Sequence, residues 1–187
     1  HNNVAIGYQT ARAMTTGNYN VAVGTQALKL TTDGASNTAV GALALEANTS
    51  GNWNTASGIE ALKANTTGNG NTSTGQQSLY WNTTGSYNTA SGVYALRGNT
   101  TGTENTGCGY YTMYNNQAGS YNTAFGTSAM YTNNGGNNNV MIGYAAGYAN
   151  TGSGNVFLGY NAGRNEAGSD KLYIANTNTA TPLIYGD

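Results

Sequence analysis

Apolar and polar positions along this chain recur with a seventeen-residue period. The stretch NTAVGALALEANTSGNW occupies residues 37–53, and NTASGIEALKANTTGNG, at residues 54–70, repeats it almost position for position. Each unit opens with Asn and carries Gly at its fifth position. The opening residues are Asn3, Asn20, Asn37, Asn54, Asn71, Asn88, Asn105, Asn122, Asn139 and, one residue early, Asn155. A fixed period of this length predicts a repeat architecture in which each unit stacks on the next.

The first five residues of each unit are typical of a short β-strand. Because side chains alternate along a strand, Val4 and Ile6 in NVAIG share one face, as do Thr38 and Val40 in NTAVG. The residue between them is usually Ala, such as Ala39, which indicates a narrow interior on the other face. The Gly that follows permits a tight turn. These glycines include Gly24, Gly41, Gly58, Gly75 and Gly92.

The second half of the unit, for example IEALKANTTG at residues 59–68, has to return the chain to the start of the next strand. Its ninth-position residues, which we expect to point inward, are Leu28, Leu45, Leu62, Leu79, Leu96, Met113 and Met130. We predict a second short strand here, because the segment is too short for a stable helix. A helical turn is the alternative, favoured by Glu60 and Lys63, which are spaced i,i+3 and could pair.

These features together predict an all-β fold, a parallel β-solenoid of about ten 17-residue coils over residues 1–169. Stacking places equivalent residues about 4.8 Å apart, so the rod would be roughly 45–50 Å long. The opening Asn side chains could then hydrogen-bond up and down the stack. We expect this structural ladder at Asn20, Asn37, Asn54, Asn71, Asn88, Asn105 and Asn122, and a second one at the turn residues Asn48, Asn65, Asn82, Asn99, Asn116 and Asn133.

Composition excludes several classes of function. Only 7% of residues are charged and the net charge is −1, which leaves no electrostatic footprint for nucleic acid. No apolar run is long enough for membrane insertion. The single His is His1, and between Lys63 and Arg164 only Arg97 and Glu104 carry charge. Paired carboxylates and clusters of metal ligands are therefore lacking, and we expect no enzyme activity, no metal and no cofactor.

The predicted interior is thin. Each coil offers an Ala, a Leu and one or two further small residues, and their burial is a small gain against the cost of ordering the whole unit. We therefore expect self-association to cover the remaining apolar face. The single Cys, Cys108, takes the fourth position of its unit, and we expect it to be a small packed residue without a disulfide.

Aromatic residues are the remaining candidates for binding. Four of them share the last position of alternate units: Tyr19, Trp53, Tyr87 and Tyr121. Exposed rings at this spacing could contact a glycan, because an aromatic ring is apolar on its face and these carry a polar rim. The alternative is that they cover turns and pack on neighbouring Gly. A second, exposed stripe is expected at the tenth position, with Tyr80, Tyr114, Tyr131 and Tyr148.

The motifs NVAIGYQTA, NTAVGALALEANTSG and NTASGVYALRGNTTG resemble the head repeats of YadA-like trimeric autotransporter adhesins, in the longer 17-residue form found in phage and phage-like tail fibres. The resemblance covers about residues 2–165. It implies left-handed β-rolls, a side-by-side homotrimer, and a role as a fibre or adhesin on an extracellular surface or virion. The residues that the resemblance assigns to packing between chains are Val4, Ile6, Val21, Val23, Val40, Ile142 and Leu158.

The last segment, DKLYIANTNTATPLIYGD at residues 170–187, breaks the period. It predicts two strands, in KLYIAN and PLIYG, joined by a polar turn. It resembles the segment that follows such repeats in tail fibres, ahead of a C-terminal trimerising or self-cleaving chaperone domain, and we expect such a region to be absent from this chain.

Two further functions remain open. An ice-binding solenoid presents Thr-x-Thr ladders on a flat face, and Thr72-Ser73-Thr74 fits that pattern. The chain could also be the non-catalytic part of a glycan-degrading fibre.

Overall fold

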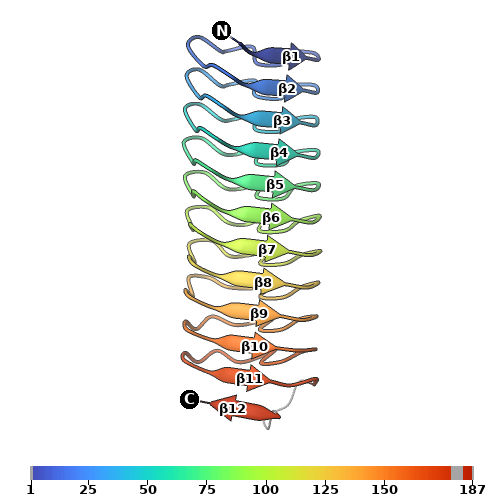
Figure 1. The fold of residues 1–187 in the computed structure, drawn as a ribbon, viewed down its shortest axis with the longest axis vertical. Helices are drawn as coiled ribbons and strands as arrows, with labels where there is room; N and C mark the ends of the chain where they lie inside the picture. Colours follow the sequence, from blue (N-terminus) through green and yellow to red (C-terminus); the bar gives the residue numbers. More distant parts are fainter. Residues whose placement is uncertain (1, 178–182, 187) are drawn as a thin grey trace.

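The computed structural model describes residues 2–177 and 183–186. The chain is a β-solenoid whose strands form one twelve-stranded sheet in sequence order, running from the N-terminus at one end of a rod to the C-terminus at the other (Figure 1). The strands are β1 (Val4–Ile6), β2 (Val21–Val23), β3 (Thr38–Val40), β4 (Thr55–Ser57), β5 (Thr72–Thr74), β6 (Thr89–Ser91), β7 (Thr106–Cys108), β8 (Thr123–Phe125), β9 (Val140–Ile142), β10 (Val156–Leu158), β11 (Leu172–Ile174) and β12 (Ile184–Gly186). The described residues contain no helix.

The register between strands follows the repeat. From β1 to β9 each residue pairs in parallel with its equivalent in the next unit, as Val21 does with Thr38. The partners from β9 to β11 are one residue closer in sequence, as for Val140 and Val156, because these units lack one residue of the turn. The predicted solenoid of parallel-strand coils is thus confirmed.

The two strands expected in the tail are both present. β11 lies parallel to β10 and adds an eleventh rung to the stack, whereas β12 runs antiparallel to β11 and covers its free edge (Figure 1). The polar turn predicted between them falls largely on residues 178–182, which lie outside the described part of the chain.

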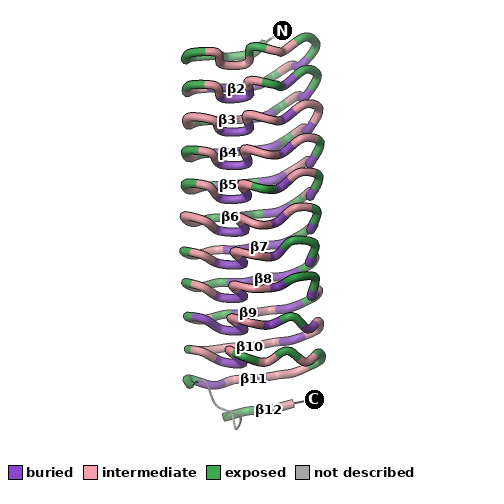
Figure 2. Tube along the Cα trace, turned by 180° about the vertical axis from the view of Figure 1, so that it is seen from behind, coloured by how far each residue is buried: buried purple, intermediate pink, exposed green. Residues whose placement is uncertain are grey.

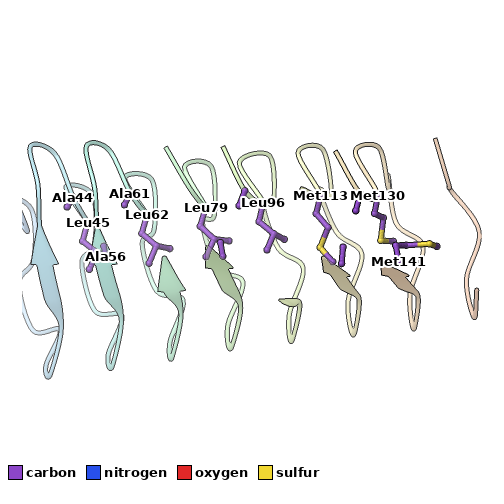
Figure 3. Packing of buried hydrophobic residues seen from close by; sticks show 14 of the residues in the cluster. Ala44, Leu45, Ala56, Ala61, Leu62, Leu79, Leu96, Met113, Met130 and Met141 are labelled. Carbon is purple, nitrogen blue, oxygen red and sulfur yellow. The ribbon is translucent and has the colours of Figure 1, made fainter. Parts of the chain in front are cut away.

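The interior is as narrow as the Ala pattern indicates. From the second coil onward the third, eighth and ninth residues are buried, so that buried stretches recur at the same place in successive rungs after the first (Figure 2). Leu62, Leu79 and Leu96 lie in line, and Met113 and Met130 continue the row (Figure 3). The strand and the return segment form the two walls of each coil. From the second coil onward, one large side chain per coil therefore fills the space between them.

The second half of the coil differs from both predictions. It is neither a strand nor a helical turn, because its seventh and ninth residues adopt left-handed backbone, as Glu60 (φ 58°) and Leu62 (φ 52°) do. Ala61 and Leu62 are consecutive and both fully buried, which the alternation of a strand does not allow. A left-handed conformation costs about 1–2 kcal/mol for a non-Gly residue, and burying a Leu side chain offsets it by about 1.5–3 kcal/mol.

Backbone hydrogen bonds between coils continue through this return segment. The Leu62 N–H donates to the carbonyl of Ser78 in the next coil (3.0 Å), and the Glu60 N–H donates to the carbonyl of Ala42 in the preceding coil (2.9 Å). The turn at Gly58 requires glycine, since φ is +143° and a Cβ there would lie 2.6 Å from the Gly75 carbonyl oxygen. Close stacking of coils is thus the reason for the regular Gly.

Candidate functional surfaces

The opening Asn residues form a buried ladder along the rod. The Asn37 side-chain N–H groups donate to Oδ1 of Asn20 (3.1 Å) and to the Gly51 carbonyl (2.8 Å), and Oδ1 of Asn37 accepts from the backbone and side chain of Asn54. The same pattern repeats through Asn71, Asn88, Asn105, Asn122 and Asn139. Each of these amides is hydrogen-bonded to its neighbours at a buried position, where an unpaired group would cost about 1–3 kcal/mol.

The turn Asn residues form a second ladder with defined ends. Nδ2 of Asn65 donates to Oδ1 of Asn48 (2.8 Å) and to the Gly68 carbonyl (3.1 Å), and equivalent bonds continue to Asn133. Asn150 occupies the next rung and is fully buried, but neither of its side-chain polar atoms has a hydrogen-bond partner. The ladder stops at Asn150, in a unit that is one residue shorter than those before it.

A third ladder, at the sixteenth position, was missed in the sequence. Oδ1 of Asn52 accepts from the Ala35 N–H (2.8 Å), Oδ1 of Asn69 accepts from the Asn52 N–H (2.9 Å), and Oγ of Ser86 accepts from the Asn69 N–H (3.0 Å). The signal was available, since Asn, Ser or Thr occupies this position in nearly every unit. This ladder holds the turn that precedes each strand.

The second and fourth residues of each coil are the first and third residues of strands β1–β10. Their side chains form an outward surface, here called the strand face. Val4, Ile6, Val21, Val40 and Ile142 lie on it with between 36% and 60% of their surface exposed, and Val23 and Leu158 are half-buried. Phe125 belongs to the same face and was missed, although its fourth-position place identifies it. Cys108, for which we expected a small packed residue, also lies here and is half-buried.

The middle of the strand face is polar. β4, β5 and β6 present six exposed hydroxyl side chains, those of Thr55, Ser57, Thr72, Thr74, Thr89 and Ser91. Ser73 points inward instead, where its Oγ donates to the Ser78 carbonyl (2.9 Å). The strand face is therefore apolar towards both ends of the rod and hydroxyl-lined between them.

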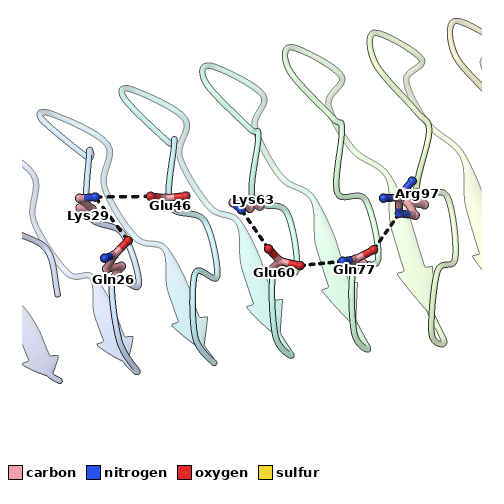
Figure 4. Close-up of polar contacts among 7 residues, drawn as sticks. All are labelled: Gln26, Lys29, Glu46, Glu60, Lys63, Gln77 and Arg97. Atoms are coloured by element: carbon pink, nitrogen blue, oxygen red, sulfur yellow. Dashed lines mark hydrogen bonds and ion pairs between the residues drawn. The ribbon is translucent and has the colours of Figure 1, made fainter. Parts of the chain in front are cut away.

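The seventh and tenth positions form another surface, here called the turn face. In its N-terminal part Nζ of Lys63 lies 2.9 Å from Oε1 of Glu60, which confirms the predicted pair. Gln77 extends this pair by donating to Glu60 Oε2 (2.6 Å) and accepting from Nε of Arg97 (2.9 Å), and Lys29 lies 3.6 Å from Glu46 (Figure 4). The hydrogen bond from Lys63 is the main reason that the pKa of Glu60 is lowered.

The C-terminal part of the turn face is aromatic. The rings of Tyr131 and Tyr148 stack with centroids 4.8 Å apart, and Tyr114 stacks on Tyr131 at 5.1 Å. The guanidinium of Arg164 lies 4.8 Å from the Tyr148 centroid, and that of Arg97 lies between Tyr80 and Tyr114. These tyrosines are half-buried rather than exposed, which corrects the expectation of an exposed stripe. Burial is the main cause that raises the pKa of Tyr131.

The aromatic column, defined as Tyr19, Trp53, Tyr87 and Tyr121, is the most exposed of the aromatic groups. The exposed fractions of these residues are 64%, 65%, 62% and 54%. Each has left-handed backbone at the last position of its coil, with φ between 57° and 59°. The Tyr87 ring lies against Gly70 of the preceding coil, where an added Cβ would approach the ring Cδ1 to 2.8 Å.

Within residues 2–177 and 183–186 there is no cluster of three or more His, Cys, Asp or Glu side chains that could hold a metal ion. In this part of the chain there is likewise no helix of the length and hydrophobicity that crossing a bilayer requires. The surfaces that remain as candidates are the strand face, the turn face and the aromatic column.

Comparison of the chain with models of known protein families, with curated proteins and with solved structures finds no match.

Proposed function

We propose that this chain is a structural segment of a surface fibre or adhesin, and that three copies pack side by side through the strand face. The observation that carries the proposal is the apolar surface that the strand face exposes in a single chain. Val4, Ile6, Val21 and Val40 lie at one end of it, and Phe125 and Ile142 lie towards the other. Packing of chains along this surface would remove all of these side chains from water.

The narrow interior supports the same proposal. A single coil buries little more than two Ala and one Leu, as Ala56, Ala61 and Leu62 illustrate. Small domains with so little core usually gain stability from association or cross-links. Cys108 is the only Cys in the chain, so no disulfide within the chain can contribute. Association of parallel rods is the remaining source of apolar burial.

A stiff rod suits a role in projection. The parallel strands and three Asn-containing ladders run along the solenoid, so each added coil lengthens the rod without a new type of contact. We place the chain on an extracellular surface or virion, where such a segment would hold a binding end away from a cell or particle and contact cell-surface glycans. We assign it no catalytic step.

Light scattering after size exclusion tests the trimer. We expect a mass of about three times the 19.2 kDa chain. Val40→Asp should shift the protein towards monomer, because it places a charge on the apolar part of the strand face. Ile59→Asp is the matched control, since Ile59 is 55% exposed but lies off the strand face, and it should leave the mass unchanged. A stable wild-type monomer would overturn the proposal.

Ice binding is the second candidate, and a specific observation favours it. The six hydroxyl side chains of β4–β6 stand exposed on three adjacent, regularly spaced strands. A flat array of this kind could order water or match an ice plane. Thermal hysteresis measured on the purified protein decides: hysteresis that disappears in Thr72→Lys would support ice binding, and its absence at high protein concentration would exclude it.

A further inference from the structure

The aromatic column is held by a scaffold that the fold builds beneath it. The backbone N–H of Trp53 donates to the Ala35 carbonyl (3.1 Å), that of Tyr87 to the Asn69 carbonyl (2.8 Å) and that of Tyr121 to the Thr103 carbonyl (3.0 Å). The residue directly before each of these three rings, Asn52, Ser86 or Ser120, belongs to the sixteenth-position ladder. The rings are therefore presented from backbone that is fixed on both sides of the turn.

Folding alone gives no reason for large rings at this position. Left-handed backbone costs a non-Gly residue about 1–2 kcal/mol. Gly70 and Gly154 occupy the same position in other coils at little cost, with φ of 64° and 72°. Because more than half of each residue in the column is exposed, burial returns little of the cost. Ser36, Glu104 and Asn138 adopt the same left-handed backbone without a ring, with φ between 56° and 58°, so the turn does not require an aromatic residue. A line of exposed rings that the fold does not require indicates a binding surface.

The spacing of the column restricts the ligand. Its members occur in every second coil, so neighbouring rings are about 9–10 Å apart along the rod. The intervening residues, Ser36, Gly70 and Glu104, carry no competing ring. Two pyranose units of an extended chain span a similar distance, and a sugar presents an apolar C–H face that packs on an aromatic ring. A ligand with this repeat would meet every ring in the same way.

The charge of the surface restricts it further. No Lys or Arg occupies the last two positions of any unit, and between Tyr19 and Tyr121 the one charged residue at these positions is Glu104. An anionic polymer would meet no opposite charge there. A residue with a hydroxyl or amide side chain directly precedes each ring in sequence, as Asn52 and Ser86 do.

We propose that the aromatic column binds a linear, neutral, β-1,4-linked polysaccharide that lies parallel to the rod, so that successive rings pack on every second sugar of the chain. The inference rests on the proposed function in one respect, because it names the cell-surface polymer that such a fibre would bind. Affinity arises from repetition: each ring contributes a weak contact, and successive contacts on one chain add through effective concentration.

Calorimetric titration with cello-oligosaccharides and N-acetylated chito-oligosaccharides of increasing length provides the test. We expect affinity to rise with each added disaccharide until the column is filled. Trp53→Gly and Tyr87→Gly should each weaken binding of the longest oligosaccharide roughly 3- to 10-fold. Glycine suits left-handed backbone, so both variants should unfold at the wild-type temperature or above it. Tyr8→Gly is the control, since Tyr8 is 68% exposed but lies outside the column, and it should bind normally.

Three results would overturn the proposal: no binding of any neutral oligosaccharide, retention of anionic polymers such as alginate only, or Gly variants that lose stability but keep their affinity. Light scattering on the same samples separates this inference from the proposed function. A trimer that binds no neutral glycan would refute the ligand alone, and a monomer that binds one would refute the trimer alone.

Discussion

Two sets of coils have a similar backbone but enclose different side chains. The N-terminal coils span residues 37–104, and the C-terminal coils span residues 139–170. In the N-terminal coils the strand contributes a small residue such as Ala56 and the return segment contributes Leu62. In the C-terminal coils the strands contribute Met141 and Phe157, and Gly takes the ninth position. The large side chain has moved from one wall of the coil to the other.

Steric exclusion prevents the strand and the return segment of one coil from both carrying a large inward side chain. A Cβ on Gly163 would lie 2.5 Å from the Phe157 ring, and a Cβ on Gly147 would lie 2.5 Å from the sulfur of Met141. Both glycines keep the left-handed backbone of the Leu that they replace, with φ of 55° and 57°. The comparison teaches that the interior accepts one large side chain per coil from either wall, and that the backbone conformation does not depend on which wall supplies it.

The largest expected effect comes from breaking this exchange. Gly163→Leu should destabilise the protein by about 3 kcal/mol or more, because it adds a side chain where Phe157 already fills the interior. Phe157→Ala should cost about 3–5 kcal/mol through the cavity that it leaves. The double variant should recover at least about 1 kcal/mol relative to the sum of the two, since the Leu then fills the space of the ring.

Urea unfolding of the four proteins measures this coupling. The matched control is the reverse exchange in an N-terminal coil, Leu62→Gly with Ala56→Phe, for which we expect coupling of the same sign. Strictly additive effects in both coils would show that the two positions fill separate spaces, and the comparison would then fail.

A smaller effect should distinguish the turn ladder in the two sets of coils. Asn65→Ala removes a side chain that donates to Asn48 and accepts from Asn82, so it should cost about 1–3 kcal/mol. Asn150→Ala removes a buried amide without a partner and should change stability by less than about 0.5 kcal/mol or increase it. Thermal unfolding measures both, and equal losses would show that Asn150 is hydrogen-bonded after all.

The smallest effects concern pH and separate the two parts of the turn face. The pKa of Glu60 is lowered on folding, mainly by the hydrogen bond from Lys63 and then by that from Gln77. Its contribution is therefore present at neutral pH and is lost as the pH falls through the folded-state pKa. The pKa of Tyr131 is raised, first by burial and then by neighbouring tyrosines, so its contribution is lost only as the pH rises above the ordinary tyrosine range.

Unfolding temperatures across the pH range measure these contributions. Glu60→Gln should reduce the loss on acidification by less than about 1 kcal/mol, as expected for a largely solvated pair. Tyr131→Phe keeps the ring stack and should remove one late step from the tyrosinate absorbance titration. If Glu60→Gln changed only the alkaline limb, the assignment of acid sensitivity to the ionic part of the turn face would be wrong.

Much of this architecture was predictable because residues one period apart in the sequence stack on one another in the solenoid. The seventeen-residue period determined that Asn20 stacks on Asn37 and that Val21 pairs beside Thr38. Alternation within the strand placed Ala39 inside and Val40 outside. The exposed apolar strand face and the position of the aromatic column follow from the same two periods.

Other features were decided only by the tertiary structure. The left-handed return segment, which buries both Ala61 and Leu62, depends on hydrogen bonds to the coils on either side and has no local sequence signal. The eleventh rung at β11 forms although its sequence has left the repeat, because the edge of β10 offers unpaired backbone groups to any extended segment. The Phe157–Gly163 exchange likewise arises from the volume enclosed by a closed coil. Periodicity determined which residues meet along the rod, whereas the path around each coil was decided by space and hydrogen bonds that exist only once the coils have stacked.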